Sequence, residues 1–465
     1  MYRIAVTDRQ TDRQTDRQTD RQTGLLLLLG IALFVAIIFI VNLRHHNYYT
    51  ANADVAAEVV FAKYQWDSKE FVPHSWYSST EARIISTPNI ASLFYGMTGN
   101  ASLALGMACC FMTIGIIASI MYFAHKVGMD SSSRLLMVFM CLALPASQRI
   151  TELLYIIASY YAIYVIAFFL LLGFYGDCLQ KKLVNKWMFA LLAAFAFLLG
   201  IQGLRAALVA FVPLLAIDIL RNCLVFMKKR TFEKHDKSRL FALALLLAVN
   251  YIGSLSPSSI DQYFSRNIRN GPAKLFAEVV PDAFAALGFS KSRLLSLQNV
   301  LLGILCLLTV MVLVRTLQKI WKKSELLASE WAFLALLASP VITMLIIAFT
   351  TYESTPRYYF GFVWALAMAT VLFGQKASKR AIWALSLIII LLSVVNVRNV
   401  YLPVLTYKEQ GKTDLQMVAE YLVANDFAIA YSTFNWANPL SVAANNEIIV
   451  AAVLDDYEQM KINPW

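Results

Sequence analysis

The sequence predicts an all-α polytopic membrane protein with about eleven transmembrane helices. The chain has 465 residues, of which 59% are hydrophobic, and its mean hydropathy is +0.60. Only 15% of the residues are charged, whereas about 25% are charged in soluble domains. Apolar runs of roughly 17–25 residues, each long enough to cross the hydrocarbon core of a bilayer, recur along the chain. These observations exclude an ordinary soluble enzyme and an intrinsically disordered chain.

Eleven apolar runs are predicted to span the membrane. They lie at about 24–43, 102–124, 135–148, 153–176, 187–201, 204–220, 240–255, 295–314, 329–350, 358–375 and 381–397. Three of them are short or closely spaced, namely 135–148 and the pair 187–201 and 204–220, which only Gln202 and Gly203 separate. These three fit half-helices or tilted segments as well as full spans.

The distribution of positive charge predicts the topology. With the N-terminus in the cytoplasm, most of the 40 lysines and arginines fall in loops on that side, and every alternate loop obeys the positive-inside rule. The net charge of +11 therefore reports orientation, and no nucleic-acid partner is predicted. We expect a multi-pass protein of the cytoplasmic membrane with its C-terminus outside. Three regions then face the exterior: the loop 44–101, the loop 256–294 and the tail from about residue 398.

Residues 7–22 are four copies of Thr-Asp-Arg-Gln, and this composition predicts a disordered cytoplasmic tail over residues 1–23. The peptide is what a repeated four-base unit, ACAG, encodes, so slippage by one unit would shift the reading frame. Phase-variable expression is one hypothesis, and a neutral repeat or a start codon assigned too far upstream is the alternative. Sequencing the tract in many single-colony isolates of one strain should reveal different repeat numbers. A fixed number in all of them would contradict the hypothesis.

The polar residues that could carry chemistry gather at the predicted outer ends of the spans, not at the bilayer midplane where transporters place their sites. The sequence contains no P-loop, GxGxxG, HExxH or GxSxG motif. The first outer loop opens with Asp54 and Glu58, which share one face of a helix because they are four residues apart. Together with Glu81 they are candidate catalytic carboxylates, although Asp54 also suits a helix N-cap. The aromatic cluster between Tyr64 and Tyr77 fits interfacial anchoring or the stacking of a sugar.

Three arginines, Arg149, Arg205 and Arg357, are also predicted at outer helix ends. The planar guanidinium binds phosphate in a bidentate manner, so these residues are candidates for holding a lipid-linked phosphate. A snorkelling role at the interface is the alternative for each. Arg357 is the strongest candidate because Glu353 and Tyr358 flank it. No cofactor is predicted; a divalent metal near the three carboxylates stays open, since no spacing demands one.

This plan resembles the GT-C superfamily of polyprenyl-phosphate-sugar-dependent glycosyltransferases, which includes protein mannosyltransferases and lipid A aminoarabinose transferases. The resemblance rests on the acidic opening of the first outer loop and on Tyr352–Phe360, which is similar to the "RY" element before a late helix. The stretches 76–81 and 431–438 are similar to uncharacterised bacterial members. In many members a second acidic residue follows the first directly, whereas Val55 stands there in this chain.

The resemblance implies an inverting glycosyltransferase. It would move a sugar from an undecaprenyl-phosphate carrier to a surface glycan, lipid or protein acceptor outside the cytoplasmic membrane, with membrane lipid around it. An acidic residue would act as base, and arginines would hold the departing phosphate. A flippase or transporter of lipid-linked saccharides is the runner-up, and a non-catalytic membrane scaffold is the third reading.

The residues after the transmembrane domain, 24–400, are expected to form a small exterior α/β segment over 401–465. Helical periodicity covers 414–422, and the run 448–454 reads as a strand. About 60 residues are marginal for an independent domain. We therefore expect a segment that either is truncated or rests on the membrane part. An acceptor-binding role, a lid and a structural cap are all open.

Overall fold

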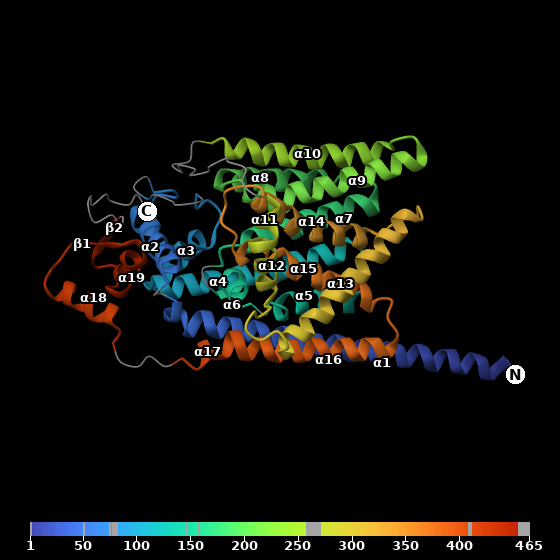
Figure 1. Cartoon of the computed structure of the whole chain (residues 1–465), viewed down its shortest axis with the longest axis horizontal. Coiled ribbons are helices and arrows are strands. Elements are labelled where there is room, and N and C mark those ends of the chain that lie inside the picture. Colours follow the sequence, from blue (N-terminus) through green and yellow to red (C-terminus); the bar gives the residue numbers. More distant parts are fainter. Residues whose placement is uncertain are drawn as a thin grey trace.

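The computed structural model shows an all-α membrane domain and a small C-terminal α/β segment (Figure 1). It describes residues 2–49, 52–73, 76, 82–145, 147–156, 159–256, 271–407 and 412–453. Within these residues, eight helices are long and apolar enough to cross a membrane, or nine if the pair Ser131–Ala143 and Gln148–Ile156 forms one bent span. The protein is therefore multi-pass, with fewer full spans than the predicted eleven.

The elements follow one another along the chain as a series of long helices interrupted by short π- and 3-10 turns. They are α1 (Tyr2–Arg44), η1 (His46–Tyr49), α2 (Ala53–Ser68), α3 (Thr87–Thr98), α4 (Ala101–Lys126), α5 (Ser131–Ala143), α6 (Gln148–Thr151), η2 (Glu152–Ile156), α7 (Ala162–Lys181), α8 (Lys186–Gln202), η3 (Ala207–Phe211), α9 (Val212–Lys229), α10 (Lys234–Ser254), α11 (Gly271–Lys274), η4 (Leu275–Val279), α12 (Val280–Leu287), α13 (Leu297–Trp321), α14 (Ala328–Ala348), η5 (Pro356–Tyr359), α15 (Gly361–Gly374), α16 (Lys379–Asn396), η6 (Val397–Tyr401), α17 (Leu402–Leu405), α18 (Asp414–Ala424), β1 (Ile429–Thr433), α19 (Phe434–Ala443) and β2 (Ile449–Val453).

The lower number of spans has physical causes in three segments. The run predicted as one span at 135–148 ends at Ala143, because Pro145 lacks a backbone donor and disfavours the helical conformation of the residue before it. Helix α8 has only 17 residues, the lower limit of the length that can cross a bilayer, and it is a shorter apolar helix than the eight candidate spans. Helix α10 has 21 residues, but its first turns carry several charged side chains, so its apolar part is short.

The Thr-Asp-Arg-Gln repeat lies in the same helix as the first span, since α1 runs without a break from Tyr2 to Arg44. The disorder that the composition of the repeat predicts stays a prediction. A helix can extend into the repeat because the apolar part of α1 supplies the nucleus, so that each added residue has only the cost of propagation. Arginine and glutamine also have high helix propensity.

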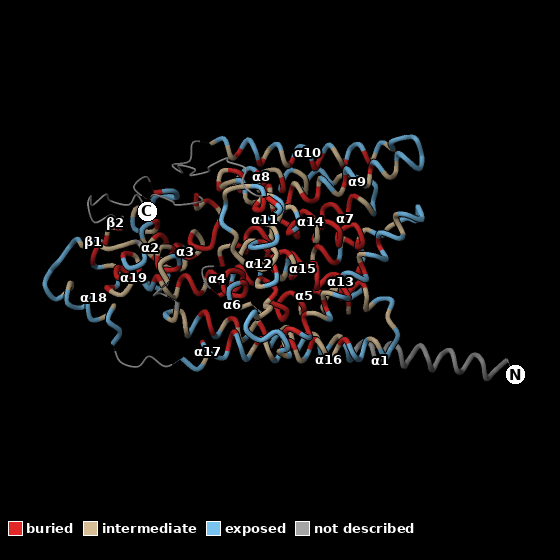
Figure 2. The backbone as a smooth tube through the Cα atoms, viewed as in Figure 1, coloured by how far each residue is buried: buried red, intermediate tan, exposed pale blue. Residues whose placement is uncertain are grey.

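The membrane domain has two distinct ends (Figure 1). The start of α1, the α9–α10 turn and the C-terminal end of α13 lie at one end, which also carries Lys228, Lys319 and Lys376 and is called the basic end below. Helices α2 and α3 and the C-terminal segment lie at the other, called the site end. Figure 2 shows buried backbone concentrated in the middle of the bundle, around α4, α7 and α15, and more exposed faces on the outer helices α10 and α16.

Helices α8 and α10 pack closely because each presents a glycine at their crossing. A Cβ atom at Gly200 would lie 2.0 Å from the Asn250 carbonyl oxygen, and one at Gly253 would lie 2.3 Å from the carbonyl oxygen of Phe197. The Asn250 side chain is buried there and donates to the Ala196 carbonyl oxygen over 2.8 Å. Small residues and an interhelical hydrogen bond are the usual means by which helices associate in a membrane.

A buried network of charges joins α9 to α10 near the basic end. The Nε atom of Arg239 donates to Asp218 over 2.8 Å, and its Nη1 atom donates to Asp236 over 2.9 Å. Arg221 donates to the same oxygen of Asp236 over 2.6 Å, and the amide of Asn222 donates to Asp218 over 3.0 Å. Two arginines and two aspartates thus neutralise one another among closely packed helices.

The C-terminal segment has the predicted α/β composition. The helix predicted at 414–422 is α18, and the strand predicted at 448–454 is β2. Strands β1 and β2 are parallel and pair from Ile429 with Ile449 to Thr433 with Val453. Helix α19 connects them and packs against α2, so this small unit rests on the loop that follows the first span of the membrane domain.

Candidate functional site

The site is built around a break between two helices, at residues 159–161. The π-turn η2 ends at Ile156, and α7 begins at Ala162. Ser159 adopts the left-handed conformation, with φ of 44°, which costs a non-glycine residue about 1–2 kcal/mol. Its carbonyl accepts a hydrogen bond from Thr87 over 3.2 Å. The strained turn holds Tyr160 and Tyr161 at the site end, where each contacts a different group of charged residues.

Tyr160 faces the carboxylates of the loop that follows the first span. Glu58 is buried on α2 and accepts two hydrogen bonds from the Nε atom of Arg83, over 2.9 and 3.2 Å, and a third from its Nη2 atom. The Arg83 guanidinium lies 5.9 Å from the centre of the Tyr160 ring. Burial, with the negative charges of Glu58 and Asp54, raises the pKa of Tyr160 well above its ordinary value. Asp54, Glu58 and Arg83 therefore form one cluster with this tyrosine.

The N-cap of α2 is Asn52, not Asp54. The side-chain oxygen of Asn52 accepts hydrogen bonds from the backbone N–H groups of Asp54, over 3.0 Å, and Val55, over 3.3 Å. The capping alternative for Asp54 is thus wrong, because another residue already satisfies these donors. Asp54 lies in the first turn of α2 with its side chain exposed, whereas Glu58 is held by Arg83.

Tyr161 lies among the arginines. The Arg205 guanidinium lies 4.6 Å from the centre of the Tyr161 ring and 5.7 Å from that of Tyr164. Arg357, in η5, lies 5.3 Å from the Tyr358 ring and is within electrostatic range of both Tyr161 and Arg205. Two residues 152 positions apart in sequence therefore bring positive charges together over an aromatic surface.

Arg357 has an unsatisfied donor. Its Nε atom is buried and has no hydrogen-bond partner, and its Nη2 atom has only a long contact, 3.5 Å, with the Tyr358 hydroxyl. Among the described residues, no carboxylate forms an ion pair with it. Buried arginine donors are normally satisfied, and an exception needs an explanation such as an absent ligand. An anion is the group that would complete this site.

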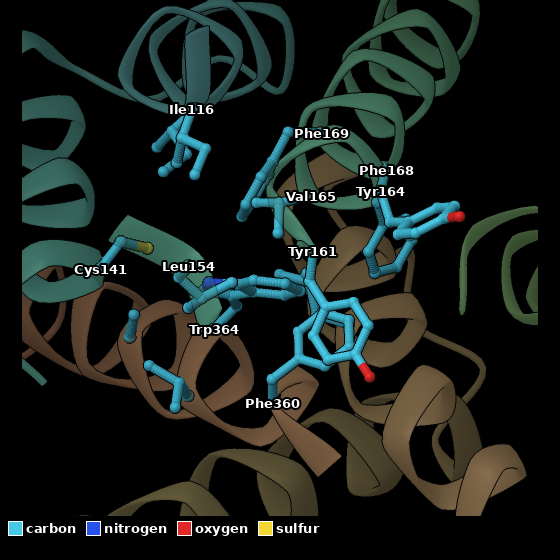
Figure 3. Close-up of a cluster of buried hydrophobic side chains, with 14 of the residues drawn as sticks. Ile116, Cys141, Leu154, Tyr161, Tyr164, Val165, Phe168, Phe169, Phe360 and Trp364 are labelled. Carbon is cyan, nitrogen blue, oxygen red and sulfur yellow. The ribbon is translucent and has the colours of Figure 1, made fainter. Parts of the chain in front are cut away.

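Large buried aromatic side chains form the floor of the site (Figure 3). The rings of Tyr161 and Phe360 are stacked, with centroids 5.2 Å apart and an angle of 17° between them. Trp364 packs edge-on against Phe360 at 4.9 Å and against Phe169 at 5.5 Å. This packing fixes the Tyr161 ring against which the Arg205 guanidinium lies.

A cavity of about 410 Å³ lies between the start of α11 and the segment that precedes η5. Tyr352, Glu353, Lys274 and Glu278 contribute to its lining. The Lys274 ammonium donates to the Thr350 carbonyl oxygen over 2.9 Å and to that of Tyr352. Burial raises the pKa of Tyr352, and the charge of Arg205 opposes this shift. Tyr352, on the lining of this cavity, is therefore within the electrostatic range of Arg205.

The structure brings most of the predicted site residues to one end of the molecule. Arg149 is exposed on the short helix α6, which packs against the η5 turn that carries Arg357. Glu81 lies outside the described residues. Within the described parts of the chain, the one group of three potential metal ligands is Glu233, His235 and Asp236 at the basic end, where Asp236 already pairs with two arginines. Asp54 and Glu58 belong to no such group.

The sequence did not predict the residues that connect the carboxylate cluster around Tyr160 with the arginines around Tyr161. Arg83 is a charged residue of the first loop, yet its pairing with Glu58 cannot be predicted from a separation of 25 residues. Tyr160, Tyr161 and Tyr164 lie in what reads as an uninterrupted apolar span. The signal that could have identified them is the density of tyrosines, since hydroxyl groups in a membrane helix need polar partners.

Comparison with known proteins identifies no relative. No protein-family model matches the chain, and no curated protein matches it. The chemistry of the site is therefore inferred from its residues and their contacts.

Proposed function

We propose that this protein is a membrane glycosyltransferase that moves a sugar from a polyprenyl-phosphate carrier to an acceptor at the outer face of the cytoplasmic membrane. The observation that carries the proposal is the buried, unpartnered Nε atom of Arg357 beside a second arginine, Arg205. Two guanidinium groups held together over tyrosine rings repel one another unless an anion lies between them. A phosphate has the charge and the acceptor geometry to satisfy both.

The position of these arginines favours a lipid-linked phosphate. Arg357 lies at the first turn of the span Pro356–Gly374, where a polyprenyl tail can stay in the bilayer while its phosphate reaches the end of the helix. The carboxylate cluster lies on the other side of the 159–161 turn, so an acceptor hydroxyl could approach the sugar from the Asp54 side. A carboxylate there can accept the hydroxyl proton as the sugar–phosphate bond breaks and the phosphate leaves with the carrier.

Replacing Arg357 by lysine tests the phosphate contact. Lysine keeps the positive charge but cannot form the planar bidentate contact, so kcat/KM for an undecaprenyl-phosphate sugar should fall about 10–100-fold, the usual cost of losing a hydrogen bond to a charged group. The measurement is sugar transfer by the purified protein in proteoliposomes. Arg398→Lys is the matched control, because Arg398 is an exposed arginine near the same end. If Arg357→Ala uses the donor normally, Arg357 is only an interfacial anchor.

The same vesicles distinguish transfer from transport. A flippase would move the lipid-linked sugar between leaflets without forming a new glycosidic bond, whereas a transferase releases the carrier phosphate. The buried rings of Tyr161, Phe360 and Trp364 pack tightly on one another, and a closely packed aromatic cluster beside the arginines favours chemistry at one end. Translocation without product would reject the proposal.

The orientation proposed here places the basic end in the cytoplasm and the site end outside. It follows from the positive-inside rule, because the lysine-rich turns and the start of α1 share the basic end. An alkaline phosphatase fused after Lys408 should be active, and a fluorescent protein fused at the same position should be dark. Fusions after Lys182, in the α7–α8 turn, should give the opposite pattern. Reversed results at both positions would invert the topology.

A further inference from the structure

A second cavity, of about 340 Å³, lies at the basic end, opposite to the candidate site. It is formed where the end of α13 meets the start of α14 and the end of α15. Its charged lining consists of four basic side chains and one carboxylate: Arg315, Lys319, Lys322, Lys376 and Glu330. The polar rim also includes Thr316 and Gln318.

The single carboxylate cannot neutralise this lining. One oxygen of the buried Glu330 accepts hydrogen bonds from both Lys319 and Lys376, the latter over 3.3 Å. In the described part of the chain, Arg315 and Lys322 form no ion pair. The Arg315 guanidinium instead lies 6.0 Å from the centre of the Phe373 ring. The cavity therefore has an excess of positive charge, and this charge favours the binding of an anion.

The surroundings of the cavity indicate that this anion belongs to a lipid. On the outer face of α13, Val310, Val314 and Leu317 are exposed, and in a membrane-spanning helix such side chains contact acyl chains. Trp321, 89% exposed, lies at the end of the same helix, as is typical of the membrane–water interface. The cavity therefore lies at headgroup depth, next to a surface that lipid tails cover.

We propose that this cavity binds the phosphate group of an anionic membrane lipid at the basic end of the bundle. The lysine and arginine side chains would hold the phosphate oxygens, and the acyl chains would lie along the exposed face of α13. Basic pockets between membrane helices bind anionic headgroups by this combination of charge and apolar contact. The proposal is independent of the chemistry at the site end.

Native mass spectrometry of the full chain in detergent, titrated with short-chain phosphatidylglycerol, tests the proposal. We expect a saturable site that phosphatidylcholine does not fill. The double variant Arg315→Gln with Lys322→Gln should bind phosphatidylglycerol about 30-fold more weakly, since each basic residue near a membrane surface contributes about fivefold. Lys322→Glu alone, at the exposed end of α13, should act in the same direction and covers the case in which the double variant folds poorly.

The matched control is Lys182→Gln with Lys186→Gln, which removes two exposed charges from the same end outside the cavity. Unchanged lipid binding by this control supports a specific site, and an equal loss in both double variants would reduce the effect to general surface charge and overturn the proposal. The same titration is repeated with glycerol phosphate and with inorganic phosphate in place of the lipid. If either binds as tightly as the lipid, the site takes free phosphate and the lipid assignment is wrong.

Discussion

Replacing Arg239 by alanine should lower the free energy of unfolding by about 3–5 kcal/mol, the usual cost of removing one partner from a buried ion pair. The Arg239 side chain is 1% exposed and that of Asp218 is fully buried. Without Arg239, the Asp218 carboxylate would lose the cation that donates to it directly and would keep the weaker hydrogen bond from the amide of Asn222. We therefore expect a sharp decrease in the folded protein recovered from membranes and in its thermal unfolding midpoint in detergent.

Two further variants separate loss of charge pairing from loss of packing. Lys237→Ala is the matched control, because Lys237 lies on the same helix and is exposed; it should be neutral within about 0.5 kcal/mol. Arg239→Met combined with Asp218→Leu removes both opposite charges and fills their space, and it should recover much of the lost stability. If the double variant is as unstable as Arg239→Ala, the network does not act through charge compensation.

The sequence predicted helices well where one local property decides the structure. The run 102–124 needs only its length and hydropathy to be a span, and it is the core helix α4. The predicted count of eleven spans was too high because the structure of some segments depends on packing against neighbouring helices. Helix α8 is at the lower limit of length for a span, and its place depends on the Gly200–Gly253 crossing with α10, which no local pattern reveals.

The candidate site shows the same limit more clearly. Charge alternation predicts that Arg205 and Arg357 lie at outer helix ends, and the structure has both at the site end. Their approach to each other depends on the turn at 159–161, where Ser159 takes a conformation that its residue type does not favour. Pairings such as Glu58 with Arg83 depend on how the outer loop folds back on the bundle, and a single sequence carries no record of that contact.

Asp54→Asn should reduce sugar transfer by about 10²-fold or more, the usual contribution of a general base. Asp54 is the exposed carboxylate of the cluster around Tyr160, whereas Glu58 is engaged by three hydrogen bonds from Arg83. Asparagine keeps the shape of the side chain but cannot accept the proton of the acceptor hydroxyl. Turnover should therefore decrease while protein yield and donor binding stay near those of the unchanged protein.

Three companion variants make the result specific to catalysis. Asp67→Asn, at an exposed position of the same helix, is the matched control and should leave turnover unchanged. Asn52→Ala removes the helix cap and should cost about 0.5–2 kcal/mol of stability with little effect on kcat. Glu58→Gln should instead destabilise the protein, because it weakens the charge pairing of Arg83 in a partly buried place. If Asp54→Asn transfers sugar at the normal rate, Asp54 is not the base, and Glu81 becomes the carboxylate to test next.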